Sequence, residues 1–419
     1  MPVAPAHRAR LNRRFPDVEA ITVPTAGRDA HRATERRWIG VGTSTNAESY
    51  RAGVEAAAAA LRGTDARLVI VFASPAQDLA AMIDGVRSVA PLVPLIGCTT
   101  AGEIATDGPG DSGVVVTALG GSGFSVATHA ARNASRDLRG AGAAAAMCAE
   151  DGSAGDHQVL LLLTDGLGGD QQEVVRGAYS VVGASVPLVG GCAGDDLAMR
   201  RTFQFFDGEV LEDSVVAAAI TSDAPLGIGV QHGWTRVGAP FLVTASSGTH
   251  VLALDDRPAL DVYLERLDAP PEARNDPAAF TRFALTHPFG LNRRSGEEVR
   301  FIAEANFEDR SIACIAAVPQ GGLAWIMEGD AGSVLDATAA ACSQAIDGLV
   351  GRPPLGFLAF DCIARRGLLG NEGIREEVSQ IKSYAQGAPV AGFYTYGEIA
   401  RTHGVSGFHN QTLVVLAFC

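Results

Sequence analysis

Three acidic side chains stand at similar places in three short segments that resemble one another. The segments are PLIGCTTAGEI (residues 94–104), PLVGGCAGDDL (residues 187–197) and PVAGFYTYGEI (residues 389–399). We call them hooks one, two and three, and their acids are Glu103, Asp195 and Glu398. A carboxylate on such a glycine-rich turn can accept hydrogen bonds from nearby backbone amides and hold the turn. It can also face a pocket and receive an ammonium or amide group of a small ligand, and the sequence leaves both interpretations open.

Tyrosine and cysteine side chains accompany these acids. Hook three adds Tyr394 and Tyr396, which could form an aromatic wall with polar contacts or could pack half-buried. Hooks one and two carry Cys98 and Cys192, where a nucleophile could lie, and Thr99 follows the first of them. A free cysteine beside glycine turns is more often a small packing residue, so a thiol hydrolase is the weaker interpretation.

Two arginines are candidate anion clamps. Arg365 lies in the segment FDCIARR, where Asp361 and Cys362 end a strand-like apolar run. Its guanidinium could bind a ligand carboxylate, or it could form a structural ion pair with Asp361 or Glu398. Arg300 lies in the strand-like segment EEVRFI. An acid, a tyrosine pair and an arginine together would suit a small zwitterion such as an amino acid.

The segments around the hooks alternate between strand-like and helix-like patterns. RLVIVFASP (residues 67–75) is a continuous apolar run typical of a strand covered on both faces, and NAESYRAGVEAAAAALRG (residues 46–63) is typical of a helix. We therefore predict an α/β fold of two domains, with mixed, largely parallel sheets built from repeated β-α-β-α-β-hook-β modules. Loops at the strand ends of such sheets commonly bind ligands.

The repeats also indicate where the parts of the chain begin and end. We expect a loosely ordered leader over residues 1–37, a first domain over 38–222 and a second domain over 223–419. The first domain contains modules 38–120 and 121–222, and the second contains an insert-like stretch at 223–310 followed by the third module at 311–419.

Composition and charge argue against several classes of partner. The chain has 419 residues, a formal net charge of -14, and no apolar run long enough to span a bilayer. The negative charge disfavours nucleic acid and anionic membrane surfaces. Seven cysteines without metal-type spacing indicate a reducing compartment and no metal centre. We expect a soluble cytoplasmic protein.

The familiar catalytic motifs are missing from the sequence. GPGDSG (residues 108–113) matches a phosphate-binding glycine pattern, but it leads into the strand-like run VVVTAL instead of a helix. Neither the G-x-S-x-G elbow of hydrolases nor the H-E-x-x-H motif of zinc proteases is present. We therefore expect that the protein is not an enzyme.

The order of several segments resembles the FIST family of bacterial signalling proteins, in which a FIST N and a FIST C sensory domain are paired. The segments are GCTTAGEI, VGGCAGDD, FLAFDCIARR, GFYTYGEIA and GFHNQT. The likeness covers residues 38–418, with FIST N over 38–222 and FIST C over 223–419. It implies a free-standing sensor of small ligands that acts through a partner protein, such as a histidine kinase or a cyclic dinucleotide enzyme. The oligomeric state is not predicted.

The resemblance also implies an alternative function, because some members of the family are haem-binding nitric oxide sensors. His409, next to Asn410 in GFHNQT, could be an iron ligand or a hydrogen-bonded turn residue, and His232 in VQHGW is an equal candidate. No C-x-x-C-H motif or Cys-Pro pair supports haem attachment. We expect no cofactor, with haem as the alternative.

Overall fold

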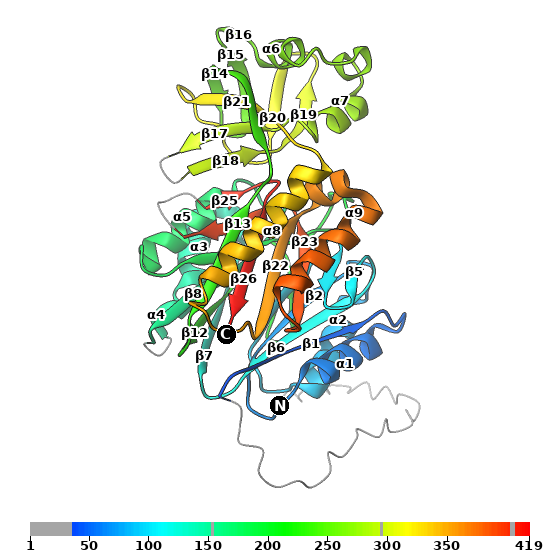
Figure 1. The fold of residues 1–419 in the computed structure, drawn as a ribbon, viewed down its shortest axis with the longest axis vertical. Coiled ribbons are helices and arrows are strands. Elements are labelled where there is room, and N and C mark those ends of the chain that lie inside the picture. The colour runs from blue at the N-terminus through cyan, green and yellow to red at the C-terminus, as the bar shows by residue number, and fades with distance from the viewer. Residues whose placement is uncertain (1–35, 152–154, 294–295, 403–406) are drawn as a thin grey trace, which may run out of the picture. The chain divides into compact units, whose positions relative to one another are not determined.

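The computed structural model describes residues 36–151, 155–293, 296–402 and 407–419. Apart from Arg36 and Arg37, the leader expected at residues 1–37 lies outside the described residues. The described part is an α/β protein with mixed sheets, which confirms the predicted fold class (Figure 1). Among its described helices, none combines the length and the apolarity needed to cross a membrane.

The first two modules have the element order that the repeats predict. Module one contains β1 (Trp38–Ser44), α1 (Ser49–Ala60), β2 (Ala66–Ala73), α2 (Leu79–Val89), β3 (Leu95–Thr99), β4 (Glu103–Ala105), β5 (Gly108–Gly110) and β6 (Val114–Gly120). Module two contains β7 (Phe124–Arg132), η1 (Ala134–Arg136), α3 (Leu138–Ala146), α4 (Cys148–Asp151), β8 (His157–Thr164), α5 (Gln171–Val182), β9 (Leu188–Cys192), β10 (Gln204–Phe206), β11 (Glu209–Leu211) and β12 (Ser214–Ser222).

Module three is split by an inserted subdomain, which we call the insert. The module contains β13 (Leu226–Gln231), α8 (Ala331–Asp347), β22 (Gly356–Cys362), α9 (Ile363–Tyr384), β23 (Val390–Thr395), β24 (Glu398–Arg401), β25 (Phe408–His409) and β26 (Leu413–Phe418). The insert contains β14 (Thr235–Ser247), β15 (His250–Leu254), β16 (Arg257–Pro258), α6 (Ala259–Arg266), η2 (Pro271–Arg274), α7 (Pro277–Ala284), β17 (Phe289–Arg293), β18 (Gly296–Arg300), β19 (Ile302–Asn306), β20 (Ser311–Cys314) and β21 (Leu323–Glu328).

In the structure the third module starts at β13, whereas the sequence pattern predicts a start at residue 311. β13 pairs with β26, whereas β20 and β21 pair with strands of the insert. The glycines of β13 look like strand breaks in the sequence, but they allow α8 to pack directly on the strand. A Cβ atom at Gly227 or Gly229 would lie 1.8 Å from the carbonyl oxygen of Ala345 or Ala341, respectively.

Each module forms a four-stranded sheet with the same strand order. The orders are β1-β6-β2-β3, β7-β12-β8-β9 and β13-β26-β22-β23. The last two strands in each of these orders run parallel, and the other neighbouring strands run antiparallel. The sheet of the insert has the order β18-β17-β21-β14-β15-β20-β19, and β16 pairs with β15 outside this order.

The short strands that follow each hook leave their own module and extend the sheet of another. β4 and β5 add to β23 of module three, β10 and β11 add to β3 of module one, and β24 and β25 add to β9 of module two. The exchange is cyclic, so each module gives one pair of strands and receives one. The repeated hook thus serves as the connector that joins the three modules.

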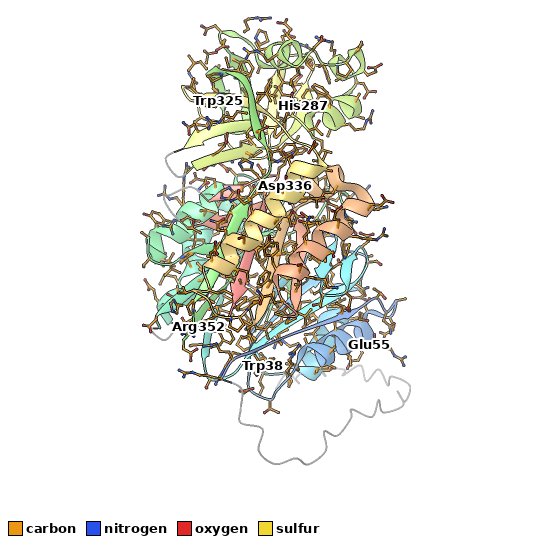
Figure 2. All side chains as sticks on the ribbon, in the orientation of Figure 1. Trp38, Glu55, His287, Trp325, Asp336 and Arg352 are labelled. Atoms are coloured by element: carbon orange, nitrogen blue, oxygen red, sulfur yellow. The ribbon has the colours of Figure 1, made fainter. Side chains whose placement is uncertain are left out.

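The inner faces of the three sheets share one apolar core. Phe72 of module one contacts Phe360 and Phe393 of module three, with ring centroids 6.3 and 4.8 Å apart. Such aromatic pairs contribute about 0.5–1.5 kcal/mol each beyond the burial of their area. Side chains of module two, including Leu161 and Val216, belong to the same core. The insert has its own core around Tyr263, Phe280 and related side chains, and Figure 2 shows His287 and Trp325 within the insert.

Candidate functional site

The three hooks meet through backbone hydrogen bonds. The N–H of Ala101 donates to the carbonyl of Tyr394 at 3.0 Å, and the N–H of Gly194 donates to the carbonyl of Thr99 at 3.0 Å. The N–H of Cys192 donates to the carbonyl of Gly397 at 2.8 Å. Each contact joins two different modules, so the structure brings Thr99, Cys192 and Tyr394 into one neighbourhood.

The acid of hook one holds its own turn. Glu103 is 2% exposed and accepts the hydroxyl of Thr100 at 2.6 Å on one carboxyl oxygen. Its other oxygen accepts the N–H of Gly113 at 3.0 Å. Burial raises the pKa of Glu103 to about 7, against the opposing effect of these two hydrogen bonds. Both carboxyl oxygens therefore have partners close in sequence.

The acid of hook three has the same arrangement. Glu398 is fully buried and accepts hydrogen bonds from the hydroxyl of Thr395 and from the N–H of Thr412, the latter at 3.1 Å. The thiol of Cys362 is a further hydrogen-bond partner of this carboxyl group. Burial raises the pKa of Glu398 to about 8, although the hydrogen bonds act in the opposite direction.

Hook two differs, because Asp195 is not the counterpart of these two acids. The strand pairing puts Gln204 of β10 at the position of Glu103 and Glu398. The N–H of Ser214 donates to its side-chain oxygen at 3.2 Å, as Gly113 does to Glu103. Eight residues lie between Asp195 and Gln204, the first residue of β10, and alignment of the short motif alone does not reveal this extra length.

Asp195 instead organises the long loop that follows it. Its carboxylate accepts the N–H groups of Met199, Arg200 and Arg201 at 2.9, 2.7 and 3.0 Å. It also accepts the hydroxyl of Tyr396 from hook three. Burial acts to raise the pKa of Asp195, but the hydrogen bonds from Tyr396 and the three amides outweigh it and lower the pKa.

The tyrosine pair of hook three divides between two environments. Tyr396 bridges hooks two and three, since its hydroxyl also accepts the N–H of Leu197 at 2.8 Å. Tyr394 is fully buried, and the guanidinium of Arg366 lies 4.8 Å from the centre of its ring. Its hydroxyl has no hydrogen-bond partner among the described residues.

The candidate thiols are buried and held in their protonated form. Burial raises the pKa of Cys98, Cys192 and Cys362 above the ordinary range. The hydroxyl of Thr164 donates to the sulfur of Cys192 at 3.1 Å. Because the thiolate is the reactive form, these cysteines are poor nucleophiles in this arrangement.

Arg365 lies in a buried ion-pair cluster. It donates to Asp361 at 2.7 Å and to Glu377 at 2.6 Å, and all three side chains are 0% exposed. The pair with Asp361 was one of the alternatives from the sequence, but Glu377 was missed. The spacing of Glu377 could have revealed that it is buried, because it lies three residues after Ile374 and four before Ile381 on the same face of α9.

Arg300 and the two candidate histidines lie where the insert meets module three. Arg300 is 1% exposed, pairs with Glu298 at 2.7 Å and donates to the carbonyl of Phe408 at 3.4 Å. Nε2 of His409 bonds to the carbonyl of Ala400 at 2.9 Å, and burial lowers the pKa of this histidine.

His232 is engaged in a similar way, and burial lowers its pKa to about 4. Its Nδ1 accepts the N–H of Trp234 at 3.0 Å. Asn410 is 1% exposed, and its side-chain oxygen has no partner among the described residues. One ring nitrogen of each histidine is bonded to the backbone, and neither ring lines the cavity described next.

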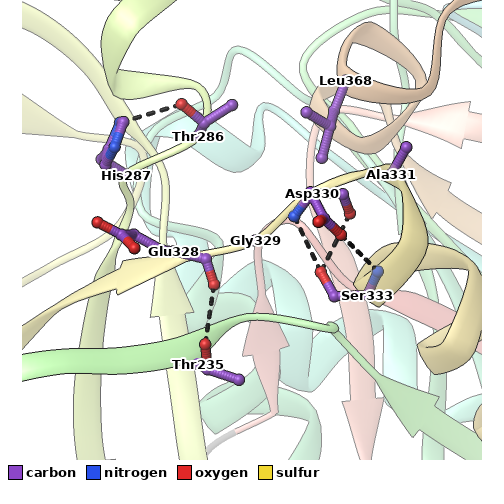
Figure 3. A pocket seen from close by; sticks show the side chains of 9 residues that line it. All are labelled: Thr235, Thr286, His287, Glu328, Gly329, Asp330, Ala331, Ser333 and Leu368. Carbon is purple, nitrogen blue, oxygen red and sulfur yellow. Dashed lines mark hydrogen bonds between the residues drawn. The ribbon is translucent and has the colours of Figure 1, made fainter.

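A cavity of about 670 Å³ lies where the insert joins module three (Figure 3). Its lining residues are Thr235, Thr286, His287, Glu328, Gly329, Asp330, Ala331, Ser333 and Leu368. The chain passes between the insert and module three twice, at residues 232–234 and 329–330, and both crossings adjoin the cavity. None of the site residues expected from the sequence lines it.

The groups around the cavity combine charge, hydrogen bonding and apolar surface. The carboxylate of Glu328 is exposed and makes no hydrogen bond or ion pair with any residue that the structure describes. Asp330 caps α8 by accepting the N–H of Ser333 at 2.8 Å. Nδ1 of His287 bonds to the carbonyl of Phe283 at 2.8 Å, which leaves Nε2 for other partners. Leu368 adds an apolar wall.

The sequence gives little sign of this cavity, because its residues come from four separate segments. Gly329 and Asp330 are recognisable as the start of a helix, but such a cap predicts an element boundary and not a site. Figure 3 shows Glu328 and His287 on one side, with Ser333, Ala331 and Leu368 on the other. The site is therefore a product of the way the insert is connected.

Comparison with known proteins identifies relatives over most of the chain. Two uncharacterized proteins of Mycobacterium tuberculosis, Rv0628c and MT0656, are each 25% identical over 392 residues, which is 91% of this chain and 99% of theirs. The uncharacterized protein MJ1623 of Methanocaldococcus jannaschii is 27% identical over 154 residues, covering 35% of this chain. This match spans only 30% of the length of MJ1623.

A cyanuric acid hydrolase from A. caulinodans is a distant match among solved structures, with a TM-score of 0.26, 13% identity, and coverage of 44% of this chain and 71% of the hydrolase. The model of the FIST N domain matches residues 67–257, and the model of the FIST C domain matches residues 259–401. The two matches meet inside the insert, next to β16. The chain therefore belongs to the FIST family, whose FIST N and FIST C domains are sensory domains for small ligands in signalling proteins.

Proposed function

We propose that this protein binds a small zwitterion, such as an amino acid, in the cavity between the insert and module three, and that it signals through a partner protein. The cavity itself is the observation that carries this proposal. Its volume of about 670 Å³ lies within the roughly 300–1,000 Å³ of ordinary small-molecule sites. Its place between two subdomains is also a common one for ligands.

The side chains of the cavity support a ligand with an ammonium group. Glu328 offers a carboxylate without a described partner, which an ammonium group would neutralise. The hook acids are less suitable, because Glu103 and Glu398 use both carboxyl oxygens for local hydrogen bonds. We therefore assign the ammonium site to Glu328 and not to the hook acids.

The opposite wall of the cavity suits the carboxylate of the same ligand. Nδ1 of His287 donates to the carbonyl of Phe283, so Nε2 of the neutral ring is an acceptor, and the hydroxyls of Thr286 and Ser333 already donate to the carbonyls of Phe283 and Asp330. The first turn of α8 instead contributes backbone N–H groups with a favourable helix dipole. Opposite charges on the ligand would thus meet complementary groups on the two walls.

The partner we propose is a signalling enzyme such as a histidine kinase or a cyclic dinucleotide enzyme. Ligand binding between the insert and module three would favour one arrangement of the two and so alter a surface that the partner recognises. Seven free cysteines support a reducing compartment, and we place the protein in the cytoplasm.

A thermal-shift screen of single amino acids, followed by calorimetric titration, tests this function. A true ligand stabilises the protein by about 2.7 kcal/mol at a hundredfold excess over Kd. Glu328→Gln removes the partner of the ammonium group and should weaken binding at least tenfold. Glu304→Gln, which changes an exposed carboxylate of β19, is the matched control and should bind normally. Absence of any stabilising amino acid, or unchanged affinity in Glu328→Gln, contradicts the proposal.

A further inference from the structure

A single guanidinium contacts the segments that form both walls of the cavity. Nη1 of Arg365 donates to the carbonyl of His232 at 3.3 Å, in the crossing that leads to Thr235. Nη2 donates to the carbonyl of Val334 at 3.4 Å, in the first turn of α8. Arg365 also lies one helical turn before Leu368 on α9. Three of the segments that line the cavity are therefore attached to one side chain.

This guanidinium is itself held by a buried polar network. Nη2 of Arg365 donates to the hydroxyl of Thr338 at 2.7 Å, and that hydroxyl lies 2.8 Å from Oε1 of Glu377. With the ion pair to Asp361, the network links β22, α8 and α9. Buried networks of this kind fix geometry strongly when every member is satisfied.

The charges of the network do not balance without an additional proton. One guanidinium faces two carboxyl groups, and all three side chains are 0% exposed. Oδ2 of Asp361 and Oε2 of Glu377 have no donor among the described residues, although the two carboxyl groups are within hydrogen-bonding reach of each other. A proton on one of them would supply the missing donor and remove an uncompensated buried charge.

The electrostatic surroundings of Asp361 also favour an additional proton in this network. Burial raises the pKa of Asp361 well above its ordinary value, the negative charge of Glu377 adds to the effect, and Arg365 opposes it. The other titratable groups around the network are His232, Cys342, Cys362, Arg366, Tyr394 and Glu398. Among them Arg366 carries a positive charge at neutral pH, and it is paired with Asp111.

We propose that Asp361 and Glu377 share one buried proton, and that this proton keeps Arg365 bound to the two walls of the cavity. Loss of the proton would place a second full negative charge beside Arg365 and draw the guanidinium away from the carbonyls of His232 and Val334. The crossing and the first turn of α8 would then loosen together. The proposal depends on the proposed function only in treating this cavity as the ligand site.

The protonation state can be measured without any ligand. Carbon NMR of protein labelled only at aspartate carboxyl groups follows each aspartate while the glutamates, including Glu398, stay silent. We expect one aspartate signal to remain at the protonated position at pH 7, to be lost in Asp361→Asn, and to persist in the control Asp170→Asn. Asp170 is another aspartate whose pKa burial raises. An Asp361 signal at the ionised position at pH 7 overturns the proposal.

A second variant keeps the test decisive if Asp361→Asn does not fold. Glu377→Gln removes the charge that shares the proton, so Asp361 should ionise at a lower pH than in the native protein. An unchanged titration of Asp361 in Glu377→Gln shows that no proton is shared. Because neither measurement uses an amino acid, failure of the proposed ligand leaves this result unaffected.

Hydrogen exchange tests the link to the cavity. After correction for the intrinsic effect of pH, amides at residues 232–235 and 331–335 should exchange at least tenfold faster once the shared proton is lost. Strands β22 and β26 serve as the internal reference. In Asp361→Asn, Glu377 alone balances the charge of Arg365 and the shared proton is absent, so the same amides should lose this acceleration. Acceleration that is identical in Asp361→Asn, or absent in the native protein, overturns the coupling.

Discussion

Gln204 occupies in module two the position that Glu398 occupies in module three. Each side chain begins the strand after its hook and accepts a backbone N–H at the start of the last strand of its module. The donors are Ser214 at 3.2 Å and Thr412 at 3.1 Å. A neutral amide therefore makes the same structural bond as the acid, so the hook does not require a charge.

Glu398→Gln should consequently fold and should flatten the dependence of stability on pH. The folded-state pKa of Glu398 is raised to about 8 from an ordinary value of 4.5, so the folded protein retains a proton that the unfolded chain releases. Between these two values the free energy of unfolding should fall with rising pH, by about 1.4 kcal/mol per unit for this one group. Urea denaturation from pH 5 to 9 measures the slope.

Glu103→Gln is the companion test. The pH range over which Glu103 changes the free energy of unfolding should end near pH 7, because its folded-state pKa is about 7. Each single variant should lose the part of the pH dependence of the unfolding free energy that comes from its own carboxyl group. The double variant should lose both parts. Equal slopes in the native protein and the double variant would show that these carboxyl groups do not titrate as described.

Asp195→Ala should destabilise the loop between β9 and β10. Its carboxylate accepts three backbone N–H groups and the hydroxyl of Tyr396, and hydrogen bonds to charged groups contribute about 1.5–3 kcal/mol each. We expect a loss of about 2–4 kcal/mol in denaturant unfolding, with faster amide exchange at residues 199–201. Asp84→Ala, an exposed change on α2, is the control and should lie within about 0.5 kcal/mol of the native protein. Equal effects of the two changes would contradict this role.

Gly233→Ala should destabilise the protein by more than the backbone strain of a positive φ alone, because the new methyl group would also collide with α8. Gly233 has a φ of +83°, and a Cβ atom there would lie 2.5 Å from the carbonyl oxygen of Ser333. Gly321 has a similar φ of +80° with open space around it, so Gly321→Ala measures the conformational cost by itself. Calorimetric melting of both variants should show the larger loss for Gly233→Ala. Equal losses would mean that α8 moves aside without cost.

The seven cysteines should react slowly with thiol reagents in the folded protein. All seven are free and buried, and burial raises the pKa of the two hook thiols, Cys98 and Cys192. A colorimetric thiol assay at pH 8 should detect all seven thiols in urea. In the folded protein almost none of them should react rapidly. A single fast thiol in the native protein, abolished by Cys98→Ala or Cys192→Ala, would instead revive the hydrolase interpretation.

Much of the fold could be predicted because it follows from local patterns. The run RLVIVFASP covers β2 except for Ala66, and the segment NAESYRAGVEAAAAALRG contains α1, since apolar periodicity within about ten residues determines such elements. The likeness of the three hooks likewise indicated three modules. The start of module three could not be found in this way, because β13 and α8 are separated by the whole insert.

The sequence by itself determined the repeated strands, helices and hooks, together with the family to which they belong, because these depend on residues that are close along the chain. Only the tertiary structure decided the cyclic exchange of strands, the equivalence of Gln204 with the hook acids, and the cavity beside Glu328. These features arise from packing between segments up to hundreds of residues apart. The partners of a buried charge such as Arg365 are likewise selected by which helices cover it and not by its neighbours in sequence.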